Sequence, residues 1–112
     1  PSIIAILSAR VGSISDNRSG GWYSYRASKA ALNMIIKNMS IELGRLNKNL
    51  IVIGLHPGTV DSALTKPFQK SIQSSKLFSP DYSVSKLSSV INSLVVSNSG
   101  KCYAWDGMEI FP

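Results

Sequence analysis

The chain has 112 residues, 44% of them hydrophobic and 16% charged, a balance that fits one small globular domain with a buried core. Its net charge of +6 comes from 12 basic residues scattered along the sequence, which argues against a nucleic-acid surface. Cys102 is the only cysteine and His56 the only histidine, so an internal disulfide is excluded and a zinc site is disfavoured.

The first half of the chain alternates between apolar runs and polar connections. Residues 2–8 form a short continuous apolar run, which predicts a strand buried on both faces of a parallel sheet. Residues 9–21 are rich in Gly, Ser, Asn and Asp and predict a loop. Residues 22–46 carry helical periodicity, with two adjacent apolar stripes. Residues 50–55 form a second apolar run and predict another central strand.

The second half repeats this alternation. Residues 61–79 contain Pro67, several serines and three lysines, and predict a mobile loop with room for a short helix. A helix is expected from Ser79 and Pro80 to about residue 97, followed by a short strand at 101–105 and a turn at Asp106-Gly107. Strands that alternate with helices predict an α/β fold with a parallel sheet, whose ligands bind beyond the carboxyl ends of the strands.

Tyr25 and Lys29 stand four residues apart at the start of the long helix, so they share one helix face. A free tyrosine loses its proton only near pH ~10, but a fixed cation nearby favours the phenolate. Such a pair can transfer a proton near neutral pH. The spacing alone is weak, because Tyr-x-x-x-Lys occurs by chance in many helices.

The sequence motifs around this pair strengthen its interpretation as a proton-transfer pair. Gly20-Gly21-Trp22-Tyr23-Ser24-Tyr25-Arg26-Ala27-Ser28-Lys29-Ala30-Ala31-Leu32 and the later Leu55-His56-Pro57-Gly58-Thr59-Val60 resemble the short-chain dehydrogenase/reductase family, in its C-factor and sniffer-type carbonyl reductase branch. The resemblance covers essentially the whole chain. It implies the C-terminal part of a doubly wound, Rossmann-like domain. It also implies hydride transfer between NAD or, slightly favoured, NADP and a small carbonyl or alcohol substrate.

The resemblance also implies roles for individual residues. Tyr25 would be the acid/base, and Lys29 would assist it and hydrogen-bond the nicotinamide ribose. Pro57 and Gly58 would lie beside the nicotinamide, and the Val60 backbone would face its carboxamide. Ser62 occupies the place of a usual threonine and keeps the hydroxyl group. His56 is expected to be a packed or solvent-facing residue rather than a catalyst.

Two departures from the family pattern are visible. The sequence contains no Gly-rich phosphate loop, so residues 1–112 are interpreted as a partial domain, the C-terminal half, without the dinucleotide-binding half. The family expects Ser-Ser-x-x-Gly ahead of the tyrosine, whereas this chain has Ser8-Ala9-Arg10-Val11-Gly12, which puts Ala9 at the usual catalytic serine position. Ser8 is one residue away and should face the opposite side of the strand. We therefore take Ser13, or a bound water, as the candidate substitute donor.

The sequence thus predicts a cytoplasmic NAD(P)-dependent oxidoreductase without a metal, membrane or nucleic-acid partner, since it shows no signal peptide and no apolar run near the length of a membrane span. The second apolar stripe of the helix at 22–46 predicts a homo-oligomer, because this helix lies in the dimer interface of many relatives. Two alternatives stay open. The protein could be a non-catalytic signalling or interaction relative, which Ala9 favours, or an inactive truncated fragment of the same fold.

Overall fold

The computed structural model describes residues 1–112 and contains a four-stranded sheet at its centre. The strands run in the order β1 (Ser2–Leu7), β2 (Leu50–His56), β5 (Cys102–Ala104) and β6 (Glu109–Ile110). β1, β2 and β5 are parallel, and Leu7 pairs with Leu55 at the carboxyl end of the register. The α/β fold with a parallel sheet, predicted from the alternating pattern, is confirmed.

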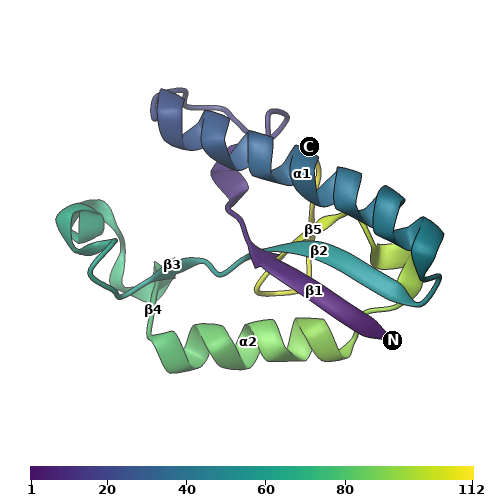
Figure 1. Ribbon diagram of the computed structural model, residues 1–112. Coiled ribbons are helices and arrows are strands. Elements are labelled where there is room, and N and C mark those ends of the chain that lie inside the picture. The colour runs from purple at the N-terminus through teal and green to yellow at the C-terminus, as the bar shows by residue number, and fades with distance from the viewer.

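Two helices cover the sheet. α1 (Tyr23–Leu46) lies on one face and α2 (Pro80–Asn92) on the other, which gives three layers (Figure 1). Of the two apolar stripes on α1, the one that contains Ile36 faces the sheet, and Ile36 is fully buried. α2 begins in a regular way, since the Ser79 hydroxyl accepts from the Tyr82 N–H and Pro80 occupies the first turn.

The core lies along β2 and the face covered by α2. Its buried members are Ile51, Ile53, Leu55, Val90 and Tyr103. β1 is a different case, because none of its residues is fully buried and Leu7 is 58% exposed. The prediction of a strand in residues 2–8 is confirmed, but the prediction that this strand is buried on both faces is wrong. β1 is an edge strand with a neighbour on one side only, and an apolar run does not reveal how many neighbours a strand has.

The C-terminal part of the chain departs from the predicted boundaries. α2 ends at Asn92 rather than near residue 97, and a 3-10 turn, η4 (Val96–Asn98), follows it. Side chains stop the helix: the Ser93 hydroxyl donates to the Val90 carbonyl, and Asn98 Oδ1 accepts from the Val95 N–H at 2.7 Å. The predicted turn at Asp106-Gly107 is present, and it leads into β6, which the sequence reading did not anticipate.

Residues 59–78 form an arm that projects away from the sheet (Figure 1). It starts and closes with a two-stranded parallel pair, β3 (Thr59–Val60) with β4 (Leu77–Phe78). Between them lie two 3-10 helices, η2 (Lys66–Ser71) and η3 (Ser74–Lys76), instead of one short helix. Every hydrogen bond recorded for residues 62–76 is made within residues 59–78. We call this segment the lid.

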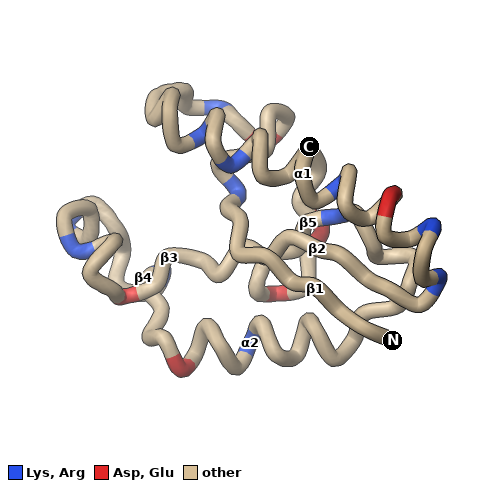
Figure 2. The backbone as a smooth tube through the Cα atoms, viewed as in Figure 1, with Lys and Arg blue, Asp and Glu red and all other residues tan.

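The chain exposes more surface than its mass requires. Its accessible area is 7255 Å², whereas a compact monomer of 12.1 kDa exposes roughly 6,000 Å². Charged residues lie mostly on the helices and connecting segments, whereas β1 and β2 carry none (Figure 2). No helix combines the length and the apolar character needed to cross a membrane.

Candidate active site

The carboxyl edge of the sheet brings the sequence-predicted segments to one place. The Ser8 N–H bonds to the Leu55 carbonyl at 2.8 Å, so the loop after β1 and the His56-Pro57 exit of β2 start side by side. The ammonium of Lys29 on α1 lies 3.5 Å from the Leu7 carbonyl at the same edge. Chain reversals and helix packing thus place α1, β1 and β2 around one corner of the fold.

Tyr25 and Lys29 lie on one face of α1, as their spacing predicts. The Lys29 Nζ atom is 5.7 Å from the centre of the Tyr25 ring. The Tyr25 side chain is 43% exposed, so its phenol is accessible to a ligand, whereas Lys29 is half-buried. A half-buried ammonium held by a strand-end carbonyl is a fixed positive charge beside an accessible phenol. This arrangement can stabilise negative charge on the phenol oxygen during proton transfer.

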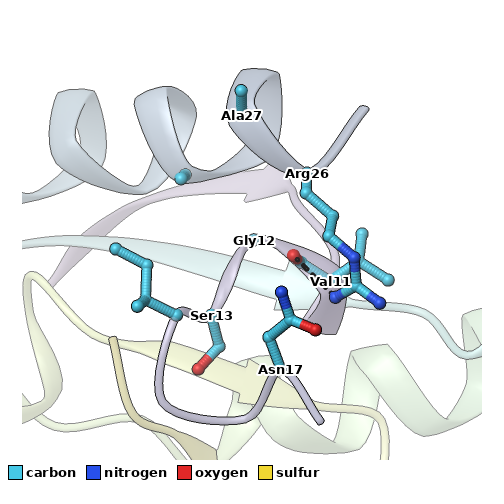
Figure 3. Close-up of a pocket in the computed structure, with 8 residues that line it drawn as sticks. Val11, Gly12, Ser13, Asn17, Arg26 and Ala27 are labelled. Carbon is cyan, nitrogen blue, oxygen red and sulfur yellow. Dashed lines mark hydrogen bonds between the residues drawn. The ribbon is translucent and has the colours of Figure 1, made fainter. Parts of the chain in front are cut away.

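The first turn of α1 is anchored to the loop before it. Gly20, Gly21 and Trp22 have φ values of 66°, 73° and 55°, and Trp22 is the only non-glycine residue in the left-handed region. The Arg26 guanidinium fastens this turn through bonds to the carbonyls of Gly20 and Gly21. It also reaches the Val11 carbonyl across a cavity of about 250 Å³ between the loop and α1 (Figure 3). Arg26, for which the sequence predicts no role, thus fixes the position of its neighbour Tyr25.

The loop after β1 packs tightly on α1. A Cβ atom at Gly12 would stand 2.7 Å from the Lys29 backbone carbon, so only glycine allows this contact. Ser8 is buried and donates to Asn33 Oδ1 at 2.5 Å, and the Cys102 thiol reaches the same oxygen at 3.3 Å. Ser8 therefore points toward α1, where Asn33 follows Tyr25 and Lys29 at helical spacing. Asn33 was missed by sequence reasoning; its signal is a polar residue among the apolar residues of the stripe that faces the sheet.

Ser13, the candidate substitute donor, makes other contacts. It is almost fully buried, and its hydroxyl donates to the Phe111 carbonyl near the end of the chain. The Ser13 hydroxyl oxygen also accepts a hydrogen bond from the Asp16 N–H at 3.2 Å. The hydroxyl hydrogen is thus engaged by the backbone, and the structure does not bring it together with Tyr25 and Lys29. These contacts favour a role for Ser13 in fixing the loop, and Ala9 leaves the usual serine position without a hydroxyl.

The segment after β2 packs closely against Phe78 of this chain, and the expected position of Pro57 and Gly58 beside a nicotinamide stays a prediction. Gly58 has a φ of 77°, and a Cβ there would collide with the Phe78 ring. Pro57 accepts a bond from the Ser83 hydroxyl of α2 at 2.8 Å. Val60 enters β3, with its carbonyl held by Thr65. Ser62 begins the turn into the lid, its carbonyl accepts the Thr65 and Lys66 N–H groups, and its hydroxyl has no partner.

His56 is packed between these segments rather than presented as a catalyst. Its Nδ1 accepts the Arg10 N–H at 3.3 Å, and its ring lies edge-on to Trp105 at 5.7 Å. Burial, helped by the nearby charge of Arg10, lowers the pKa of His56 from 6.5 to about 4. The ring is therefore neutral at pH 7. Cys102 is similarly unreactive, because burial raises the pKa of its thiol.

Aromatic rings connect the lid to the fixed part of the site. Trp22 meets Phe68 of the lid at 5.0 Å in an edge-to-face arrangement, and Phe78 at the lid's base meets Trp105 in the same way at 5.0 Å. Trp22 is 57% exposed and Phe68 46% exposed despite this contact. The lid thus touches the residue that immediately precedes α1, three positions before Tyr25.

Comparison with known proteins agrees with this geometry. The family model for short chain dehydrogenases matches residues 2–73, which is well over half of the chain. The chain belongs to the short chain dehydrogenase family. Among curated relatives, it is 38% identical to the 1-hydroxy-2-glutathionyl-2-methyl-3-butene dehydrogenase of Rhodococcus sp. over 93% of this chain and 44% of that protein. It is 36% identical to the C-signal of Myxococcus xanthus over 96% of this chain and 59% of that protein.

Solved structures give the same answer for the fold. The carbonyl reductase Sniffer of D. melanogaster superposes with a TM-score of 0.82 at 29% identity, over 98% of this chain and 41% of its own. The NADPH-bound carbonyl reductase from chicken fatty liver superposes with a TM-score of 0.83 at 28% identity, over 98% of this chain and 42% of its own. The 112 residues therefore span between 41% and 59% of the length of these four relatives.

Proposed function

We propose that this short chain dehydrogenase chain forms the catalytic half of a carbonyl reductase that uses NADPH or NADH. One observation carries the proposal: Lys29 holds its charge beside the accessible Tyr25 phenol at the sheet edge where Pro57 and Gly58 leave β2. In the intact protein, a dinucleotide-binding half would precede this chain. The proportion of the relatives that the chain covers and the open edge of β1 support that arrangement.

The residues of this chain would transfer the proton and orient the ligands. Tyr25 gives its phenol proton to the substrate oxygen when the carbonyl is reduced, and takes it back from the alcohol in the reverse direction. Lys29 stabilises the resulting negative charge on the phenol oxygen by proximity. The hydrogen bonds of Arg26 and the packing of Gly12 on the Lys29 backbone keep Tyr25 and Lys29 in position.

The cofactor fits the residues present. A bound nicotinamide supplies the hydride. The unpartnered Ser62 hydroxyl, with the Val60 backbone nearby in the chain, can hold a carboxamide or phosphate. Lys29 can bond a ribose hydroxyl. NADPH is the favoured form, because solved relatives carry NADPH or NADP.

The test is Tyr25→Phe in the intact protein. Loss of the phenol should lower kcat for carbonyl reduction by about 10²- to 10⁴-fold and leave the NADPH affinity nearly unchanged, because the proton is needed only in the transition state. NADPH oxidation on a panel of aldehydes and ketones measures kcat, and calorimetry measures the affinity. Lys29→Met should lower both quantities. Full turnover by Tyr25→Phe would remove Tyr25 from the mechanism.

A second function is favoured by one specific observation. Ala9 cannot donate a hydrogen bond, and the Ser13 hydroxyl is held by Phe111. A non-catalytic signalling or interaction protein on the same fold would tolerate both features. Turnover that is undetectable in the wild type but appears in Ala9→Ser would support this second function. Wild-type turnover that Ser13→Ala leaves intact would support catalysis in which a water serves as the donor.

We also propose that α1 mediates homo-oligomer formation. Met34 and Ile35 are 63% and 50% exposed on its outer side, and Ile41 is 44% exposed one to two turns further on. Isolated exposed apolar residues are common, but three on one helix form a surface that a second copy could cover. Met34→Lys together with Ile41→Lys should convert an oligomer of the intact protein to monomers in sedimentation experiments. An unchanged mass would exclude this interface.

A further inference from the structure

A cleft of about 290 Å³ opens at the same edge of the sheet, on the side of the lid. The loop after β1, the exit of β2, the end of the lid and the residue after β5 each contribute to its walls. The residues that line it are Arg10, His56, Gly58, Thr59, Ser75, Lys76, Phe78 and Trp105. One wall therefore follows Ala9 directly in the sequence and another belongs to the Pro57-Gly58 segment, whereas Tyr25 and Lys29 lie outside the lining.

The polar groups of the cleft are donors. Arg10 and Lys76 carry positive charge, and Ser75 and Thr59 add hydroxyls. His56 accepts the Arg10 N–H through Nδ1, so its hydrogen is on the other ring nitrogen, which can donate. No carboxylate lines the cleft. Asp16, which does not line the cleft, places its Oδ1 atom 3.8 Å from Nη1 of Arg10. Both side chains of this ion pair are more than a third exposed. This long, solvated contact leaves most of the guanidinium hydrogens free.

The remaining walls are apolar. Phe78 and Trp105 meet edge-to-face at 5.0 Å, and Gly58 leaves room for the Phe78 ring. Cations at one part and aromatic rings at another suit a ligand with an apolar body and an anionic end. A dinucleotide phosphate fits less well, because such phosphates are bound by N–H groups at the start of a long helix, and the two helical turns here, Arg10–Gly12 and η3, have three residues each.

We propose that this cleft binds the carboxylate of the substrate, so that the preferred substrates are carbonyl compounds with a carboxylate at the far end of an apolar chain. The proposal rests on the reductase function and specifies its substrate class. Arg10 binds the carboxylate from the fixed side of the cleft, and Lys76 from the lid. The aromatic pair contacts the chain between the carboxylate and the carbonyl.

The experiment uses the intact protein and a series of straight-chain ω-oxo carboxylates of increasing length, each paired with its methyl ester. At the best length, kcat/KM for the acid should exceed that for the ester by about tenfold or more, since ionised partners make the stronger hydrogen bonds. Arg10→Gln should reduce this acid-to-ester ratio about tenfold, and Lys76→Gln should reduce it less, because Lys76 is exposed. Lys70→Gln, elsewhere in the lid, should leave the ratio unchanged.

Each other outcome has a defined meaning. Turnover of acids and esters at equal rates at every length overturns the carboxylate cleft and leaves the reductase function standing. A loss of NADPH affinity in Arg10→Gln with an unchanged ratio assigns the cleft to a cofactor phosphate, which also overturns the proposal. Without any turnover, calorimetry on the acids decides: acid binding that is lost in Arg10→Gln supports the cleft while the reductase function fails, and no acid binding overturns both.

Discussion

The two segments that surround the proposed site are held in opposite ways. The loop after β1, residues 8–22, is tied to distant parts of the chain: Ser8 to Leu55 and Asn33, and Ser13 to Phe111. The lid has its hydrogen bonds within itself and reaches the rest of the molecule through aromatic contacts such as Trp22 with Phe68. The segment beside Tyr25 and Lys29 is thus fixed, and the segment beside the substrate cleft is loosely attached.

This difference separates two functions. Proton transfer requires reacting atoms at a defined distance, and a loop anchored at several long-range points provides it. Substrate entry and release require a segment that can move at low cost, and a self-contained loop meets that need. Changes in the lid can therefore alter the substrate without disturbing Tyr25. The following predictions test that separation, beginning with the largest effect.

The first prediction concerns His56, which joins the fixed loop to β2 through the Arg10 N–H. Its pKa is about 4 in the folded protein, against 6.5 when unfolded, so the unfolded state binds more protons between these values. Stability should be fully present above pH 6.5 and should fall as the pH drops toward 4, by up to about 3 kcal/mol. Urea unfolding of the intact protein at several pH values measures this loss.

His56→Gln is the control for that measurement. Glutamine keeps a polar side chain of similar reach but does not titrate. The stability lost between pH 6.5 and 4 should become smaller in this variant. If wild type and His56→Gln lose the same stability in this window, other groups cause the acid sensitivity, and His56 is not a neutral link of the fixed segment.

The second prediction compares two glycines that contact different surroundings. Gly12→Ala places a methyl group against the Lys29 backbone and should destabilise the intact protein by about 1–3 kcal/mol. It should also lower kcat, because it displaces Lys29. Gly44→Ala in α1 meets nothing within 4 Å and should stabilise by about 0.5–1 kcal/mol. Thermal unfolding distinguishes the two, and equal effects at both positions would show that the loop does not press on α1.

The third prediction concerns the contact between Trp22 and the lid. Phe68→Leu removes an edge-to-face pair that is worth about 0.5–1.5 kcal/mol, so the lid should close less often over the substrate. We expect KM to rise about two- to tenfold while kcat changes little. Trp22→Leu should have a similar effect, and the double variant should cost less than the sum of the two. Additive effects would mean that the two rings act independently.

The sequence predicts the parts of the molecule that depend on local pattern. Apolar runs locate β1 and β2, helical periodicity locates α1 to within a residue, and the four-residue spacing places Tyr25 and Lys29 on one face. What it does not predict depends on distant partners. The exposure of β1 follows from its edge position, and the orientation of Ser13 follows from Phe111, 98 residues away.

Other misses have a local cause that periodicity does not capture. The end of α2 is set by the Ser93 and Asn98 side chains, which bond to nearby backbone groups and compete with the helix. The cleft between Arg10 and Lys76 joins residues from four separate segments, and no sequence window contains them together.

Hydrogen exchange on the intact protein tests the contrast between the two segments most directly. The account predicts slow exchange for the amides of Gly12 and Ser13 in the fixed loop and fast exchange through residues 62–76 of the lid. Addition of NADPH together with a substrate analogue should slow exchange in the lid and leave the fixed loop unchanged. Equal exchange in both segments, or protection by ligand of residues 8–22 alone, would contradict the account.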